Sequence, residues 1–181
     1  MNRRLLLTSI AAVAATPVLA QTNAAPALSA TRDKHIKDTL TIGSLSLMLS
    51  RIALPRINNS QLKQFAQFEI AEQETVADVL NAIKTNAAPS GSVATPSDAE
   101  VMKNLDEAGK AAVEKMRGLR AGVEFDREYH RQEVEGHQKL LEIQEAYLKA
   151  PDDLDETNAA KLARGMIKEH LALLADMQKL G

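Results

Sequence analysis

Apolar residues recur every three to four positions along most of the chain, which is the pattern of amphipathic helices. The pattern is interrupted at residues that end or begin helices: Pro55, the Ser- and Pro-rich stretch 85–97, Gly118, Gly122 and Pro151. These interruptions predict four long helices and one shorter one, at about 33–54, 60–84, 98–118, 124–149 and 152–180. Because most connections are short, we expect an all-α fold, an antiparallel four-helix bundle with an additional shorter helix.

Two of the predicted helices begin with capping signals. Ser60 follows two asparagines and is expected to cap the second helix. Ser97 and Glu100 form a capping box at the start of the third. Both signals support the predicted boundaries.

The amino-acid composition limits the kinds of site that the protein can contain. The 181 residues are 45% hydrophobic and only 3% aromatic, and they include no cysteine, which excludes disulfides and thiolate ligands. Lys and Arg number 22 against 24 Asp and Glu, so there is no basic excess of the kind that binds nucleic acid, and no nucleic-acid partner is expected. Any site must be built from histidine, carboxylates, amides and hydroxyls.

The first 20 residues resemble an export signal. Arg3 and Arg4 precede an apolar run, and the stretch ends in small residues at Ala20, where we expect cleavage and export to a bacterial periplasm. The paired arginines fit the twin-arginine route as well as the general secretory one. The run is too short to span a bilayer, and no transmembrane segment is expected after cleavage. The predicted organisation is a signal peptide at 1–20, a flexible leader at 21–32 and one helical-bundle domain at 33–181.

The stretch FDREYHRQEVEGHQ, residues 125–138, has ionisable side chains on both faces of the predicted helix. On a helical wheel, one arc of this helix is uniformly charged and is expected to face solvent: Arg127, Glu128, Arg131, Glu135, Lys139, Glu142 and Glu145. The opposite half is apolar but includes Asp126, Glu133 and His137, with His130 to one side. Four ionisable groups therefore point towards the expected core.

Two other helices show the same feature. Glu69 lies near the centre of the apolar face of helix 60–84, with Gln73 beside it and Glu72 in the same half. His170 lies within the apolar face of the last helix. The apolar residues of these two faces, which we expect to be buried, include Phe68, Val79, Leu162 and Leu173.

Buried carboxylates must be paired, protonated or bound to metal, because burying an unpaired charge is costly. One interpretation is a structural hydrogen-bond network of the inward groups. Its members would be Glu69, Asp126, Glu133, His137, His170 and Tyr129, with Gln73 and His130 as further residues of the polar core. The other is a single metal ion in the bundle core. Glu133 and His137 are four residues apart and can reach one ion, and imidazole with carboxylate suits Fe, Mn, Zn or Cu. The candidate ligands are Glu69, Glu133, His137 and His170, with Asp126 and Glu72 as secondary candidates.

Three segments resemble those of a known family. FAQFEIAEQ (65–73), FDREYHRQEVEGHQ and KEHLALLADM (168–177) are similar to motifs of the exported bacterial domain-of-unknown-function 4142 family, and the resemblance covers about residues 36–179. It implies a ferritin-like bundle and no established reaction. Di-iron bundles use Glu-x-x-His pairs, and none of the four histidines has a glutamate three residues before it. A ferroxidase-type di-iron centre is therefore not expected.

The leading functional hypothesis is an exported, non-enzymatic bundle whose inward cluster is structural or binds one metal ion. The first alternative is a metal-dependent oxidoreductase of oxidative or metal stress. The second is an envelope-stress interaction protein with a purely structural polar core. It would act through an exposed apolar face of helix 33–54, which would also serve a homo-oligomer. His35, near the start of that helix, is expected at the surface or at an interface.

Overall fold

The computed structural model describes residues 29–178, and all of its regular elements are helices. Their bounds are α1 Ala30–Ala53, α2 Ser60–Thr85, α3 Asp98–Lys103, α4 Glu107–Gly118, α5 Val123–Tyr147 and α6 Leu154–Gln178. The predicted all-α bundle is confirmed, except that the one shorter helix is two, α3 and α4. The predicted signal peptide and most of the leader lie outside the described residues, while residues 30–32 of the leader belong to α1.

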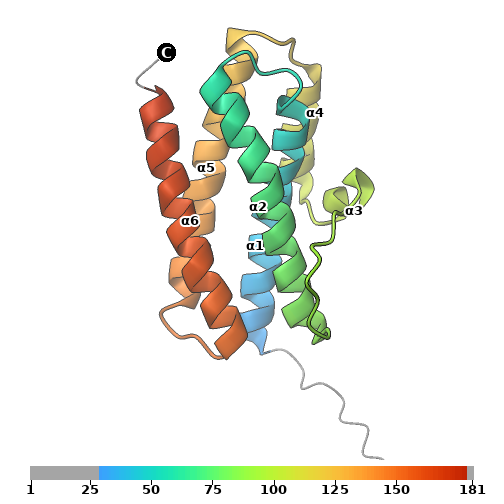
Figure 1. Ribbon diagram of the computed structural model, residues 1–181, viewed down its shortest axis with the longest axis vertical. Helices are drawn as coiled ribbons and strands as arrows, with labels where there is room; N and C mark the ends of the chain where they lie inside the picture. Colours follow the sequence, from blue (N-terminus) through green and yellow to red (C-terminus); the bar gives the residue numbers. More distant parts are fainter. Residues whose placement is uncertain (1–28, 179–181) are drawn as a thin grey trace, which may run out of the picture.

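The four long helices run up, down, down and up (Figure 1). Helices α1 and α2 form an antiparallel hairpin, and residues 86–122, which include α3 and α4, return the chain to the opposite end of the bundle. Helix α5 therefore runs parallel to α2, and α6 pairs with α5 as a second hairpin. A bundle with one long crossover is the arrangement of ferritin-like folds, as expected.

Side-chain caps determine where α2, α3 and α4 begin. Asn59, and not Ser60, caps α2, because its side-chain oxygen accepts hydrogen bonds from the backbone of both Gln61 and Leu62. The capping box of Ser97 and Glu100 is present as predicted. The third predicted helix is divided because Asp106 caps a new helix, α4, by accepting from the backbone of Gly109.

Helix α1 is the central helix of the fold. It packs against α2 and α5 along its length and against the crossover helices α3 and α4. Its apolar side chains, among them Ile36, Leu47 and Met48, are buried inside the chain itself, which accounts for the unusual apolarity of this segment. Within residues 29–178, no helix is both long enough and apolar enough to cross a membrane.

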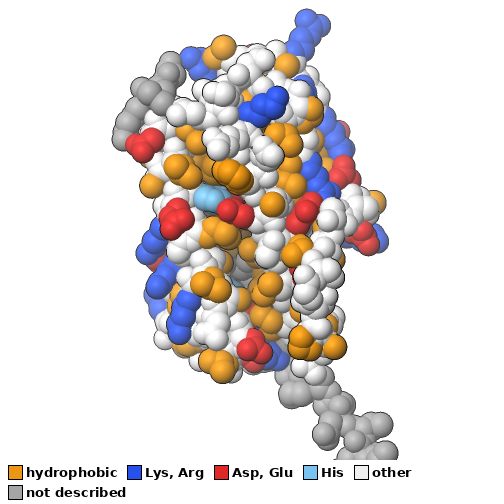
Figure 2. All heavy atoms as spheres, in the orientation of Figure 1, with side chains coloured by type: hydrophobic (Ala, Val, Ile, Leu, Met, Phe, Trp, Pro, Cys, Tyr) orange, Lys and Arg blue, Asp and Glu red, His pale blue; other side chains and the backbone are white. Residues whose placement is uncertain are grey.

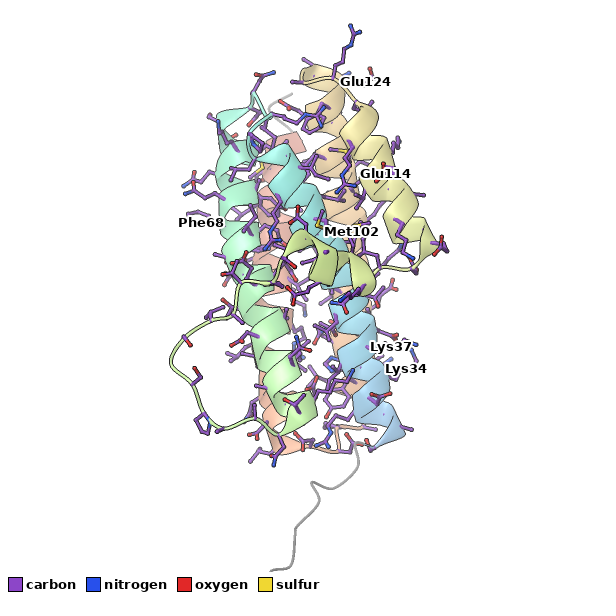
Figure 3. The ribbon with its side chains drawn as sticks, turned by 90° about the vertical axis from the view of Figure 1, so that its right-hand side faces the viewer. Lys34, Lys37, Phe68, Met102, Glu114 and Glu124 are labelled. Atoms are coloured by element: carbon purple, nitrogen blue, oxygen red, sulfur yellow. The ribbon has the colours of Figure 1, made fainter. Side chains whose placement is uncertain are left out.

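The outer surface of α2 and α6 is more apolar than predicted. Phe68 and Val79 on α2, and Leu162 and Leu173 on α6, are exposed, so their predicted burial is wrong. The buried line of α6 is narrower than its apolar face, because alanines and Ile167 fill the contact with the bundle. Figure 2 shows apolar side chains spread over this face, and Figure 3 shows Phe68 pointing away from the bundle.

Candidate metal centre

Three ionisable side chains from three helices meet in the middle of the bundle. They are Glu69 of α2, His137 of α5 and His170 of α6, which we call the central triad. All three are buried, and each offers one ligand atom to the same point. Helical periodicity predicts that all three of these side chains face the core.

The spacing of the three ligand atoms matches the coordination shell of a metal ion. Glu69 Oε2 lies 3.4 Å from His137 Nε2 and 3.1 Å from His170 Nδ1. The two nitrogens lie 3.0 Å apart. Ligands at neighbouring corners of a tetrahedral or octahedral ion, with bonds of about 2.1 Å, are separated by about 3.0–3.4 Å. The triad could therefore accept an ion without rearranging its backbone.

Outer contacts determine which nitrogen of each histidine faces this point. His137 Nδ1 donates to the backbone carbonyl of Glu133 at 2.8 Å, which leaves Nε2 as the free acceptor. His170 Nε2 faces Glu72 Oε2 at 2.8 Å, which favours a proton on Nε2 and leaves Nδ1 towards the triad. Histidine ligands in metal sites are oriented by such partners on the opposite ring nitrogen. Phe65 packs against both rings.

The two oxygens of the Glu69 carboxylate have different partners. Glu69 Oε1 accepts from the hydroxyl of Ser46 at 2.6 Å and from the amide of Gln73 at 2.9 Å. Glu69 Oε2 is buried and accepts no aligned hydrogen bond among the described residues. A buried carboxylate oxygen without a hydrogen is unfavourable unless a cation lies beside it.

Glu133 lies next to the triad but is not one of its three ligand residues; its Oε2 is 3.6 Å from His137 Nδ1, the nitrogen that bonds the Glu133 carbonyl. Its Oε2 lies 2.5 Å from Ser46 Oγ, and the same hydroxyl contacts Glu69. Ser46 has one hydrogen and can donate to only one carboxylate, so the other must bring its own proton. Burial, reinforced by repulsion from Glu69, raises the pKa of Glu133 to about 8. Glu133 is therefore the protonated partner at neutral pH, and Glu69 carries the charge.

The electrostatics of the triad favour positive charge at its centre. Burial acts to lower the pKa of His170, but pairing with Glu69 and Glu72 outweighs it and raises that pKa to about 10. Burial also acts to lower the pKa of His137, but pairing with Glu69 outweighs burial and raises that pKa. The pKa of Glu69 is held far below its ordinary value against burial, by pairing with the two histidines. Protons or a metal ion can supply this positive charge.

The remaining predicted residues lie near the triad or away from it. Asp126 accepts from the backbone of Asn58 and Asn59 and fixes the α1–α2 turn, so it does not join the triad. His130 donates to the carbonyl of Leu174 on α6. Tyr129 is buried and hydrogen-bonded to Ser50 at 2.7 Å, and burial raises its pKa well above the ordinary value.

A second buried polar cluster was missed. His35 is buried, and its expected place at the surface or an interface is wrong. Its Nδ1 contacts Glu156 Oε1, its Nε2 lies 2.8 Å from Gln144 Oε1, and Gln144 in turn donates to Thr39. We call these four residues the His35 cluster. Tyr147 stacks on the His35 ring, which closes the cluster from the side.

The missed residues had weak signals in the sequence. Glu156 lies in the first turn of α6, where acidic residues are common because they favour the helix dipole. Ser46 and Ser50 are four residues apart in an otherwise apolar helix, and that spacing was the available sign that one face of α1 contacts polar groups.

Comparison with known proteins places the chain among helical proteins without an assigned function. A family model described as "Domain of unknown function (DUF4142)" matches residues 17–177. No curated protein matches the sequence. The crystal structure of a DUF305 fragment from Deinococcus radiodurans is similar, with a TM-score of 0.65 and 18% identity over 84% of this chain and 97% of that one. At this identity the similarity shows the fold alone.

Proposed function

The chain belongs to the DUF4142 family, whose description assigns no activity, and we therefore propose a function from the site: the protein binds one divalent transition-metal ion through the central triad. The observation that carries this proposal is the convergence of three ligand atoms on one point, where Glu69 Oε2 is buried and has no aligned hydrogen bond from any residue that the structure describes. Two imidazoles with one carboxylate suit Zn, Fe, Mn or Cu.

The surroundings of the triad favour holding an ion over turning over a substrate. Two cavities flank the site: one of about 390 Å³ between α1, α2 and the crossover, and one of about 250 Å³ between α2 and α6. Gln73 lines the first and Glu72 the second, so both cavities meet residues that support the ligands and not the ligands themselves. We propose metal binding without catalysis, in a protein exported to the periplasm, as the sequence of residues 1–20 suggests.

The test is a metal titration with two matched histidine variants. Chelator-treated protein is titrated with Zn²⁺, Mn²⁺, Fe²⁺ and Cu²⁺, with bound metal counted by elemental analysis and melting temperature followed in parallel. We expect one ion per chain and a rise in melting temperature, because an ion that binds only the folded state stabilises it. At one hundred times its dissociation constant, the ion adds about 2.7 kcal/mol to the free energy of unfolding.

His137→Ala removes a triad ligand and should abolish stoichiometric binding. His130→Ala is the control. His130 lies on the same helix and also bonds to α6, but it is not part of the triad. Retention of the ion by His137→Ala, or no stoichiometric binding by the unaltered protein, would exclude the proposal.

A further inference from the structure

Accepting the proposed metal function, we infer that the ion enters and leaves between α2 and α6, and that Glu72 is the carboxylate that captures it. The argument begins with exposure. The side chains of Glu69 and His137 are at most 1% exposed, that of His170 is 9% exposed, and that of Glu72 is 33% exposed. Along this chain of contacts, side-chain exposure therefore rises from the triad to the α2–α6 surface.

Two other sides of the triad are closed. Ser46 of α1 and Glu133 of α5 are buried and hydrogen-bonded to each other, which covers the side that faces α1. Phe65 covers both imidazole rings and is itself buried. An ion arriving from either side would have to displace close-packed side chains.

The surface between α2 and α6 has features that would attract a cation. The cavity between α2 and α6 has apolar walls, including Val76, Val79, Leu162 and Met166, and Glu72 is the charged residue in its lining. Apolar walls focus the field of a single carboxylate and raise the local concentration of cations. In Figure 2 a histidine reaches the surface between α6 and α2, with an acidic side chain beside it and apolar side chains around both.

Glu72 and Glu69 are placed to pass an ion from one to the other. They lie three residues apart on α2 and therefore on the same side of that helix, and His170 contacts both. Glu72 binds the hydrated ion first. The His170 ring, which Glu72 Oε2 faces at 2.8 Å, then turns to admit the ion to Glu69 and His137.

The experiment measures the rates of loading and release separately. Co²⁺, whose visible absorption reports its coordination, is mixed with metal-free full-length protein in stopped flow at low ionic strength, and release is followed after adding excess chelator. If Glu72 captures the ion, Glu72→Gln should slow loading about tenfold, in line with electrostatic steering. If Glu72 only orients His170, the same substitution should speed release and leave loading unchanged.

Two controls match the charge and the position. Glu142→Gln removes the same charge from the exposed side of α5 and should leave loading unchanged. Phe68→Lys, one helical turn from Glu72, and Leu162→Lys, in the wall of the cavity, each place a positive charge near the route and should slow loading. Loading that is unaffected by Glu72→Gln and Phe68→Lys, with binding intact, overturns the route alone. No Co²⁺ binding by the unaltered protein overturns the metal site and the route together.

Discussion

The central triad and the His35 cluster have nearly the same composition but differ in how their polar atoms are paired. Each combines histidine with a fully buried glutamate across several helices. In the His35 cluster both ring nitrogens have partners of their own, Glu156 and Gln144. Within residues 29–178 the second oxygen of Glu156 has no hydrogen bond, and both nitrogens of His35 already have other partners. In the triad, two nitrogens and an oxygen face one another and depend on a shared positive charge.

The difference shows which feature distinguishes a metal site from a structural network. Burial of histidine and glutamate together is present in both regions, so it does not discriminate between them. The direction of the lone pairs does, because a structural network places a hydrogen between each pair of polar atoms. Three predictions test this distinction, beginning with the largest expected effect.

Removing the carboxylate of the His35 cluster should destabilise the protein and spare the metal. Glu156→Ala leaves His35 Nδ1 buried without its partner, and breaking such a pair costs about 3 kcal/mol in the free energy of unfolding. Urea denaturation measures this loss, and Zn²⁺ titration should give an unchanged dissociation constant. Glu156→Gln, which keeps a hydrogen-bonding side chain, should lose less. Weakened Zn²⁺ binding in Glu156→Ala would mean that the two regions act as one site.

The triad should respond to pH in opposite ways with and without metal. The pKa of His170 is raised from 6.5 to about 10 in the folded state, so its stabilising contribution to the metal-free protein is complete below pH 6.5 and disappears as pH rises through 10. A metal ion must displace protons, so its affinity should rise about tenfold per pH unit for each proton released. Urea unfolding between pH 6.5 and 9, with and without Zn²⁺, measures both trends. Zn²⁺ affinity that does not change with pH would contradict the displacement of protons.

The smallest effect concerns the support of Glu69. A Cβ at Gly43 would overlap the amide oxygen of Gln73, whose nitrogen donates to Glu69. Gly43→Ala should therefore cost about 1 kcal/mol and slightly weaken Zn²⁺ binding. Gly136→Ala is the helical control, because its Cβ would make only an ordinary contact with Ile42, and it should stabilise the protein by about 0.5–1 kcal/mol. Thermal unfolding of both variants measures this difference in stability. Equal melting temperatures would contradict the prediction.

The sequence was sufficient for the parts of this structure that depend on helical periodicity. The four long helices and the inward orientation of Glu69, Glu133, His137 and His170 follow from a repeat of 3.6 residues. Periodicity does not give the relative height of side chains on different helices. For that reason Glu133 could not be separated from the triad, although it turns instead to Ser46.

The His35 cluster could not be predicted for a related reason. His35 is covered by the start of α6 and by the end of α5, residues more than a hundred positions away along the chain. Considered within its own helix, it lies beside charged residues near an end and resembles a surface residue. Only the docking of the two hairpins buries it.

The same docking has a consequence for the order of events in the cell. The triad takes one ligand from the first hairpin and two from the second, on opposite sides of the crossover, so the ligands come together only after the bundle has folded. An extended chain threaded through a membrane cannot carry its ion with it, whereas a chain exported after folding can. If the protein is exported and the triad is filled as proposed, the compartment in which the protein folds is the first that can supply the ion.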